Sequence, residues 1–180
     1  MKRALLGILV LMIVMTLIAT SAFAQQGKKA IGAGVELALP MGDFGDAADM
    51  GFGATGAFQY GFRPNIDFMD AVGYLHWGGK GDLADLDYSW NAIPIQVGGK
   101  YFFQTTESRF YVGGLVGFHI FSFKIRSESS SETKMGLAPL GGYELKVGEN
   151  MMLDFQARYQ FVADDLSYFG LRVGLNFGLK

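Results

Sequence analysis

The clearest pattern in the chain is a strict alternation of apolar and polar residues near its C-terminal end. Between residues 151 and 161, apolar side chains such as Phe155 and Phe161 alternate with polar ones such as Asp154 and Arg158. The same alternation returns between residues 169 and 179. A period of two is typical of β-strands, because successive side chains of a strand point to opposite faces. Each segment has roughly the 9–11 residues that a tilted membrane-crossing strand needs.

Eight segments of similar length show this alternation. They span residues 30–40, 51–62, 67–78, 90–103, 110–123, 136–147, 151–161 and 169–179. The links at 41–50, 79–89 and 124–134 are about ten residues long, whereas those at 63–66, 104–108 and 148–150 are tight turns. The shorter link at 163–167 falls on the side of the long ones. Short turns on one rim and longer loops on the other are typical of outer-membrane barrels, with the turns on the periplasmic side.

The distribution of charge predicts that the polar face lines the barrel interior and the apolar face contacts lipid. A soluble barrel would show the reverse, with its apolar side chains inside. The apolar face carries almost no charge, whereas the charged residues of the segments fall on the other face. These candidate interior residues are Glu36, Asp70, Lys100, Glu144, Lys146, Asp154, Arg158 and Arg172. The sequence therefore predicts an all-β fold, an eight-stranded antiparallel up-and-down transmembrane β-barrel.

The interior charges are predicted to pair. Glu36 and Arg172 fall at similar depth on the first and last segments, which must pair to close the barrel, and Arg158 lies beside them. We expect a Glu36–Arg172–Arg158 cluster, with the other five charges in a second layer nearer the turns. An unpaired buried charge would cost several kcal/mol. The preferred interpretation is an interior plugged by ion pairs, and the alternative is a narrow gated pore for small solutes or ions whose pairs exchange partners.

Aromatic residues near the segment ends are candidates for the membrane–water interface. The rings of Trp and Tyr favour this region because they are apolar while one edge forms hydrogen bonds. The candidates are Tyr60, Tyr101 and Phe103 at the turn rim, and Trp77 and Trp90 at the loop rim.

The N-terminus predicts export. A basic start, an apolar run to about Ile18 and the sequence Ala22-Phe23-Ala24 describe a cleaved signal peptide over residues 1–24. Residues 25–180 are then expected to form one barrel domain. Without Lys2 and Arg3, 13 basic residues stand against 17 acidic ones, a net charge of −4, which argues against nucleic acid as a partner. The chain has no cysteine, so disulfides and thiolate metal sites are excluded.

With these features the chain resembles the small eight-stranded outer-membrane β-barrel family of Gram-negative bacteria, of the OmpA barrel-domain and OmpX type. The segment Pro40-Met41-Gly42-Asp43-Phe44, followed by Gly51-Phe52-Gly53, resembles the first loop of this family. Arg172, Gly174, Phe177 and Leu179 resemble the assembly signal of the last strand. The resemblance implies insertion by the outer-membrane assembly machinery after binding by periplasmic chaperones, with contacts to membrane lipid and lipopolysaccharide.

Both termini are expected on the periplasmic side and the longer loops outside the cell. We expect a monomer, although the sequence leaves the oligomeric state open. A structural or surface-interaction role is favoured, with the narrow pore as the alternative. A lipid-modifying enzyme is less favoured. The two histidines, His76 and His119, are both predicted to point inward as polar fillers, and His119 lacks the His-x-Ser arrangement of barrel deacylases.

Two groups of loop acids are candidate cation ligands. The first is Asp43, Asp46 and Asp49, and the second is Asp82, Asp85 and Asp87. Either group could bind calcium or bridge lipopolysaccharide through divalent ions. The second group lacks the glycine and the distal Glu of a calcium-binding loop. Solvated loops are the preferred interpretation, so we expect no metal ion and no cofactor.

Overall fold

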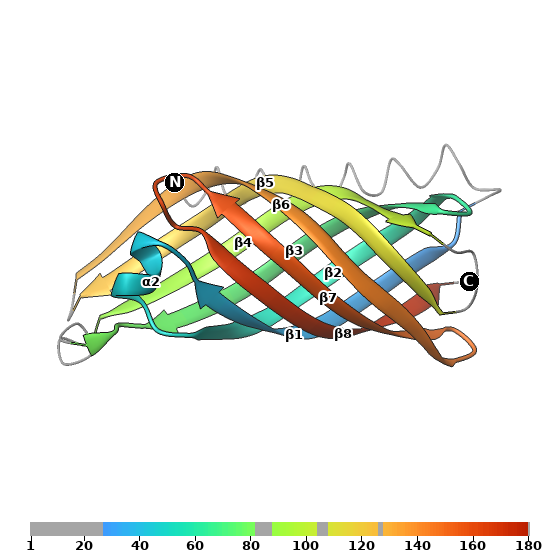
Figure 1. Cartoon of the computed structure of the whole chain (residues 1–180), viewed down its shortest axis with the longest axis horizontal. Coiled ribbons are helices and arrows are strands. Elements are labelled where there is room, and N and C mark those ends of the chain that lie inside the picture. The colour runs from blue at the N-terminus through green and yellow to red at the C-terminus, as the bar shows by residue number, and fades with distance from the viewer. Residues whose placement is uncertain (1–26, 82–87, 104–107, 126–127, 180) are drawn as a thin grey trace.

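The computed structural model of the chain describes residues 27–81, 88–103, 108–125 and 128–179, so the predicted signal peptide at 1–24 lies outside the described residues. Eight antiparallel strands form a closed barrel in chain order (Figure 1). The strands are β1 Lys29–Pro40, β2 Gly51–Arg63, β3 Ile66–Gly78, β4 Ser89–Phe102, β5 Arg109–Ile125, β6 Glu128–Gly148, β7 Met151–Val162 and β8 Tyr168–Leu179. The short helix α2, Asp43–Ala47, lies between β1 and β2. The predicted fold is confirmed.

Closure occurs between the first and last strands, where β1 pairs with β8 over the whole of both strands. In this register Glu36 lies opposite Arg172. Closure leaves no strand edge unpaired in the membrane, which is the condition for a sheet to exist in hydrocarbon. Among the described residues, no helix is long and apolar enough to span a membrane.

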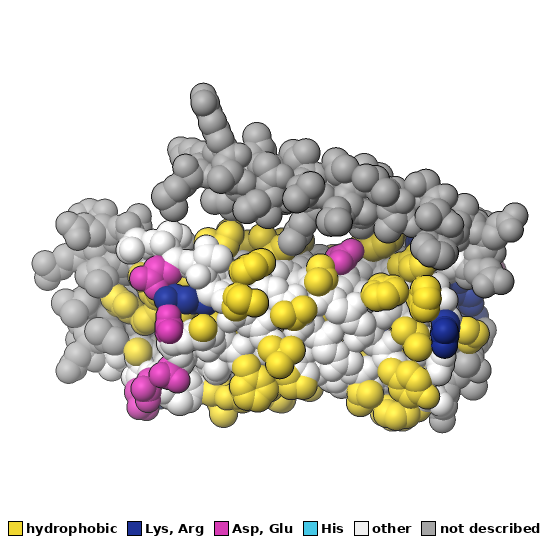
Figure 2. Space-filling view, turned by 90° about the horizontal axis from the view of Figure 1, so that it is seen from above, with side chains coloured by type: hydrophobic (Ala, Val, Ile, Leu, Met, Phe, Trp, Pro, Cys, Tyr) yellow, Lys and Arg dark blue, Asp and Glu magenta, His cyan; other side chains and the backbone are white. Residues whose placement is uncertain are grey.

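The two ends of the barrel differ. Figure 1 shows α2, in the connection between β1 and β2, at one end, here called the loop end. The two-residue turns between β2 and β3 and between β6 and β7 lie at the other end, here called the turn end. Large apolar side chains cover the outer wall, and Val35, at 69% exposed, is an example. Figure 2 shows hydrophobic side chains along one face of this wall, with most of the charged ones near the two ends.

The hairpin of β5 and β6 is longer than the sequence predicted. Residues 124–134 were expected to form a loop, yet β5 continues to Ile125 and β6 starts at Glu128. β6 pairs with β7 only from Gly136 onward, so the hairpin extends beyond its neighbour at the loop end. The hydroxyl oxygens of Ser122 on β5 and Ser131 on β6 lie 2.9 Å apart, at hydrogen-bonding distance. A strand that extends past the membrane needs no apolar face, and the period-two signal is therefore missing there.

The predicted phase of the third segment is wrong. Asp70 and His76 were expected to point inward, whereas both lie on the outer face, opposite Phe58 and Phe52 of β2. Trp77, predicted at the membrane interface, points inward and is fully buried. Both faces of this segment mix polar and apolar residues, so alternation alone cannot distinguish them. Pairing with β2 and β4 decides the phase.

Trp90 was also predicted at the membrane interface, and this prediction is wrong. It lies on the inner side of β4, where its ring contacts Phe44 and Phe123 at centroid distances of 5.1 and 4.5 Å. Tyr101 and Phe103 do lie on the outer wall at the turn end, with their rings 5.7 Å apart. Tyr60 occupies the same outer face on β2.

Candidate functional site

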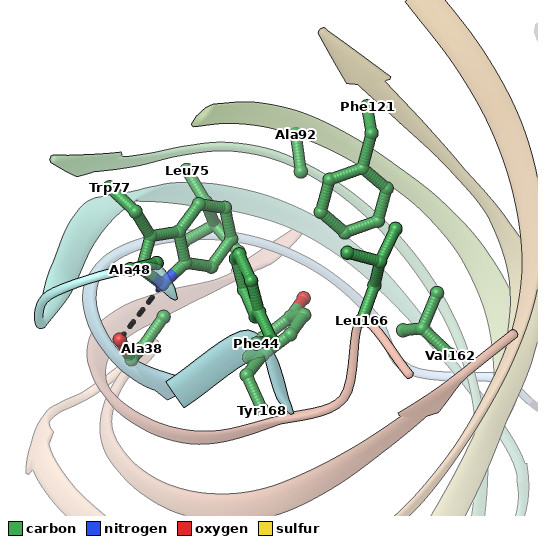
Figure 3. Close-up of a cluster of buried hydrophobic side chains, with 10 residues drawn as sticks. All are labelled: Ala38, Phe44, Ala48, Leu75, Trp77, Ala92, Phe121, Val162, Leu166 and Tyr168. Atoms are coloured by element: carbon green, nitrogen blue, oxygen red, sulfur yellow. Dashed lines mark hydrogen bonds between the residues drawn. The ribbon is translucent and has the colours of Figure 1, made fainter. Parts of the chain in front are cut away.

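The barrel interior is the candidate site, and at the loop end it is closed by an apolar cluster that we call the aromatic lid. Its buried members are Ala38, Phe44, Ala48, Leu75, Trp77, Ala92, Phe121, Val162, Leu166 and Tyr168 (Figure 3). They come from six strands, from the segment around α2 and from the β7–β8 connection. A layer of this kind is dry and close-packed, since apolar rings leave little room for water.

Phe44 inserts into the lid from the first loop. Gly42 precedes α2 with a φ of 57°, a conformation that glycine adopts without strain, and this turn directs the helix over the barrel mouth. The Phe44 ring lies edge-on to Trp77 at 5.4 Å, and Figure 3 shows it between Trp77, Tyr168 and Leu166. The Trp77 indole in turn donates to the carbonyl oxygen of Ala38 at 3.0 Å. Nothing in the loop sequence indicated this insertion.

Below the lid, Glu36 forms a bidentate salt bridge with the guanidinium of Arg158. Arg158 Nε donates to Glu36 Oε1 at 3.0 Å, and Arg158 Nη2 donates to Oε2 of the same carboxylate. Thr55 adds a hydroxyl bond to Oε2 at 2.8 Å. All three side chains are buried. Such fork-to-fork pairing is the geometry in which a buried carboxylate and a guanidinium best offset their loss of hydration.

Asp154 is the centre of a second group. Its Oδ2 accepts from Lys100 Nζ at 3.2 Å and from Arg172 Nη1 at 3.0 Å, while Oδ1 accepts from the Tyr111 hydroxyl at 2.6 Å. Lys100 also donates to Glu144 at 3.1 Å. The Lys100 ammonium lies 4.2 Å from the centre of the Tyr111 ring, which adds a cation–π contact.

The network continues to the turn end through Arg109. Its guanidinium donates to Glu144 Oε2 at 3.0 and 3.1 Å and to Asp67 at 3.4 Å. The same guanidinium lies 3.4 Å from the centre of the Phe102 ring. In the described interior, the buried or half-buried acids of the network are Glu36, Asp67, Glu144 and Asp154, and its bases are Lys100, Arg109, Arg158 and Arg172. The network is therefore neutral overall.

The partners differ in detail from the predicted cluster. Arg172 lies opposite Glu36 in the strand register, but it donates its hydrogen bond to Asp154 rather than to Glu36. Lys100, Glu144 and Asp154 lie together on the turn side of the Glu36–Arg158 pair. Lys146 faces the same way, half-buried near the end of β6.

Inward-facing glycines provide the space that this network fills. A Cβ added at Gly174 would lie 2.6 Å from Arg172 Nη2, and one at Gly170 would lie 2.6 Å from Glu36 Oε1. Because eight strands enclose only enough space for side chains, two arginines fit inside only where neighbouring positions lack a side chain. The inward-facing glycines thus leave the space that the inward-facing arginine side chains occupy.

Several members of the network were missed by sequence reasoning. Asp67, at the start of the third segment, was not among the predicted interior charges, and Arg109 lies just before the fifth segment. The paired amides of Gln96 and Gln160, which exchange hydrogen bonds at 3.0 and 2.9 Å, were also missed. Arg109 shares the inward phase of Tyr111, and this phase is the signal that could have identified it.

His119 is buried in the interior, where its ring stacks on Phe121 and its Nε2 lies 3.4 Å from the Tyr168 hydroxyl. Asp43, Asp46 and Asp49 are exposed at the loop end, while the second acid group, residues 82–87, lies outside the described residues. Within the described ranges, no group of three or more His, Asp or Glu side chains is placed to hold a metal ion.

A closed eight-stranded barrel with an apolar outer wall and a charge-paired interior defines a small membrane-spanning barrel. Residues 10–178 match the family described as outer membrane protein beta-barrel domain, and the chain belongs to this family. Membership implies an outer-membrane location. Among curated proteins, no sequence matches the chain.

Solved structures of similar fold come from several bacteria. Neisserial surface protein A is 21% identical with a TM-score of 0.68, over 86% of this chain and 100% of that one. Ail, the attachment invasion locus protein of Yersinia pestis, is 17% identical with a TM-score of 0.62, over 86% and 100%. OprG from Pseudomonas aeruginosa is 13% identical with a TM-score of 0.62, over 85% and 96%. These similarities support the fold.

Proposed function

We propose that this protein is a plugged outer-membrane barrel with a structural or surface-interaction role. The observation that supports the proposal most is the filling of the interior. The aromatic lid covers the loop end, and the charge network continues below it to Arg109 near the turn end. A solute entering from either end meets packed side chains. Function then depends on the outer wall and on the loops.

The proposal orients the loop end outside the cell and both termini toward the periplasm. It is supported by the unequal lengths of the connections at the two ends. Phe177 and Leu179 face outward on β8, where the assembly machinery could bind them, while Arg172 and Gly174 face inward. We retain these four residues as the assembly signal. Periplasmic chaperones before insertion, and lipid and lipopolysaccharide afterwards, complete the set of partners.

The plugged interior predicts the absence of ion conduction. Purified protein in planar lipid bilayers is expected to give no conductance steps, and the Arg172→Ala variant is expected to give none either. The reason is that Lys100 and Tyr111 still hold Asp154 when Arg172 is removed. A general porin inserted in the same membrane provides the positive control. Discrete steps from either form of the barrel would contradict a plugged interior.

One observation favours the alternative of a narrow gated pore. Arg158 Nη1 and two N–H groups of Arg172, at Nε and Nη2, have no hydrogen-bond partner among the described residues. Spare donors of this kind would allow the carboxylates to exchange partners. The conductance experiment above separates this alternative from the plugged barrel.

The proposed surface role has a charge preference. The described loop-end acids are Asp43, Asp46, Asp49, Glu132, Asp164 and Asp165, against the lysines Lys80 and Lys134. Glu132 and Asp164 already pair with Lys134. An acidic rim favours cationic partners, or anionic ones bridged by divalent ions, and repels polyanions.

Sucrose octasulfate, a heparin analogue, occupies one structure of Ail, and we expect this chain to differ. Titration of the folded barrel with sucrose octasulfate in neutral detergent should show no binding, because the loop-end acids repel the sulfates. A variant with Asp43→Lys and Asp46→Lys, both exposed and outside the barrel wall, serves as the matched control and should gain salt-dependent binding. Binding by the unaltered chain would contradict the acidic-rim assignment.

Catalysis is not part of this proposal. His119 is fully buried between Phe121 and Tyr168, where a lipid substrate has no access. His76 lies on the outer wall, with Nδ1 2.8 Å from Asn91 Oδ1. The family itself is defined by membrane barrels rather than by an enzymatic activity.

A further inference from the structure

One carboxylate interrupts the apolar outer wall. Asp70 is half-buried on the outer face of β3, between Phe58 of β2 and Val97 of β4. In the described part of the strands, the other outward-facing charges, Lys29 and Arg63, lie at the turn end, where water is close. Asp70 is the fifth of the thirteen residues of β3. Given a rise of about 3.3 Å per residue and a tilt of about 45°, it lies roughly 9 Å inside the barrel's turn end.

At this depth the carboxylate lacks a partner in the part of the chain that the structure describes. No hydrogen bond or ion pair from the described residues reaches it. Acyl chains offer no donor, and lipid headgroups remain at the interface. Ionisable groups inside a membrane almost always face a protein or a water-filled cavity, so an outward-facing one indicates a partner in the plane of the membrane.

The same face is suited to close contact with another protein. Toward the loop end, Asn91 Oδ1 accepts a hydrogen bond from the Tyr74 hydroxyl at 2.6 Å and lies 2.8 Å from His76 Nδ1. Beside Tyr74 and Val72, the outer face of β2 carries only the small residues Ala54 and Gly56. Ala33 of β1 lies opposite Gly56 in the sheet register and extends this low strip. Small residues that allow backbones to approach, together with polar groups, are typical of protein contacts within membranes.

We propose that the outer face of β1–β4 around Asp70 binds a second copy of this chain within the membrane. All copies insert in the same direction, so a two-fold axis along the membrane normal places Asp70 of one copy opposite Asp70 of the other at equal depth. Two carboxyl groups that share one proton form a hydrogen bond and carry one charge instead of two. No other outward-facing group of the described wall offers this self-complementarity at that depth. From the sequence we expected a monomer and placed Asp70 inside the barrel.

The absence of cysteine makes the contact directly testable. Val72→Cys introduces a thiol on the same outer face of β3, at a position that is 49% exposed. Val173→Cys on β8, 43% exposed and three strands away, is the matched control. Both variants would be reconstituted in phosphatidylethanolamine–phosphatidylglycerol vesicles at low protein density and oxidised. We expect the yield of disulfide-linked dimer to be about tenfold higher for Val72→Cys than for the control.

Asp70→Leu in the Val72→Cys background should reduce the dimer to the level of the control. Asp70→Asn should retain most of it, because an amide pair is also self-complementary. Heat-dependent migration on a denaturing gel verifies that each variant is folded. Equal yields at the two cysteine positions, or a yield unaffected by Asp70→Leu, would overturn the proposal. In whole cells, a Val72→Cys adduct formed only with a different protein would also overturn it, since the occupant would then not be a second copy.

Discussion

Replacing Arg158 with methionine is expected to lower the free energy of unfolding by about 3–5 kcal/mol, because the Glu36 carboxylate would remain buried without its counter-charge. Among the described residues, the Thr55 hydroxyl would be the remaining hydrogen-bond donor to this carboxylate. The measurement is equilibrium unfolding in urea from lipid vesicles, followed by tryptophan fluorescence. Methionine keeps much of the volume of arginine, so the change tests charge rather than packing.

The matched control for Arg158→Met removes both charges. The double variant Glu36→Gln with Arg158→Met leaves no buried ion and is expected to be clearly more stable than the single variant. A double-mutant cycle with Glu36→Gln alone gives the coupling between the two side chains. If Arg158→Met costs no more than the double variant, Glu36 does not depend on this arginine and the pairing is wrong.

Replacing Trp77 with alanine should cost about 3–5 kcal/mol, the range for removing a large aromatic side chain from a packed core. Trp77 is fully buried, contacts Phe44 and Tyr168, and donates its indole N–H to Ala38. The same urea titration measures the loss, with Trp90 as the remaining fluorophore. A protease that cleaves in the first loop should also act faster, since Phe44 loses one of the rings that anchor it in the lid.

Phe118→Ala is the control for the lid experiment. Phe118 also carries a large ring and lies in the middle of β5, but it faces lipid and is 48% exposed. Acyl chains can fill the space that its ring leaves, so a smaller loss is expected. Equal losses at the two positions would indicate that Trp77 faces lipid, as the sequence first suggested.

The fold could be predicted because lipid imposes a simple rule. Segments such as β7 and β8 alternate strictly, since one face must be apolar and the other can be charged. β3 broke the rule on both faces: Trp77 and Leu75 face inward because the loop end of the interior is apolar, while Asp70 faces outward. Alternation alone therefore assigns the wrong face of a strand to the interior where part of that interior is apolar.

The candidate site was partly predictable from depth alone. Counting along the closing strands placed Glu36 opposite Arg172, which is their strand register. Depth does not determine which of two arginines a carboxylate binds, because that depends on rotamers and on the space left by Gly170 and Gly174. The insertion of Phe44 was unpredictable for a different reason: a single aromatic residue in an acidic loop has no period.

The bond between Glu36 and Arg158 joins residues 122 positions apart, and β8 lies between their strands. It can therefore form only after the last strand has arrived beside the first. Until then, both charges would face an unfinished interior without their partners. The pair thus favours complete closure. A barrel with only seven strands in place would contain two charged side chains without their partners, whereas in the closed barrel the two are paired. Accurate closure is favoured by electrostatics as well as by backbone hydrogen bonds.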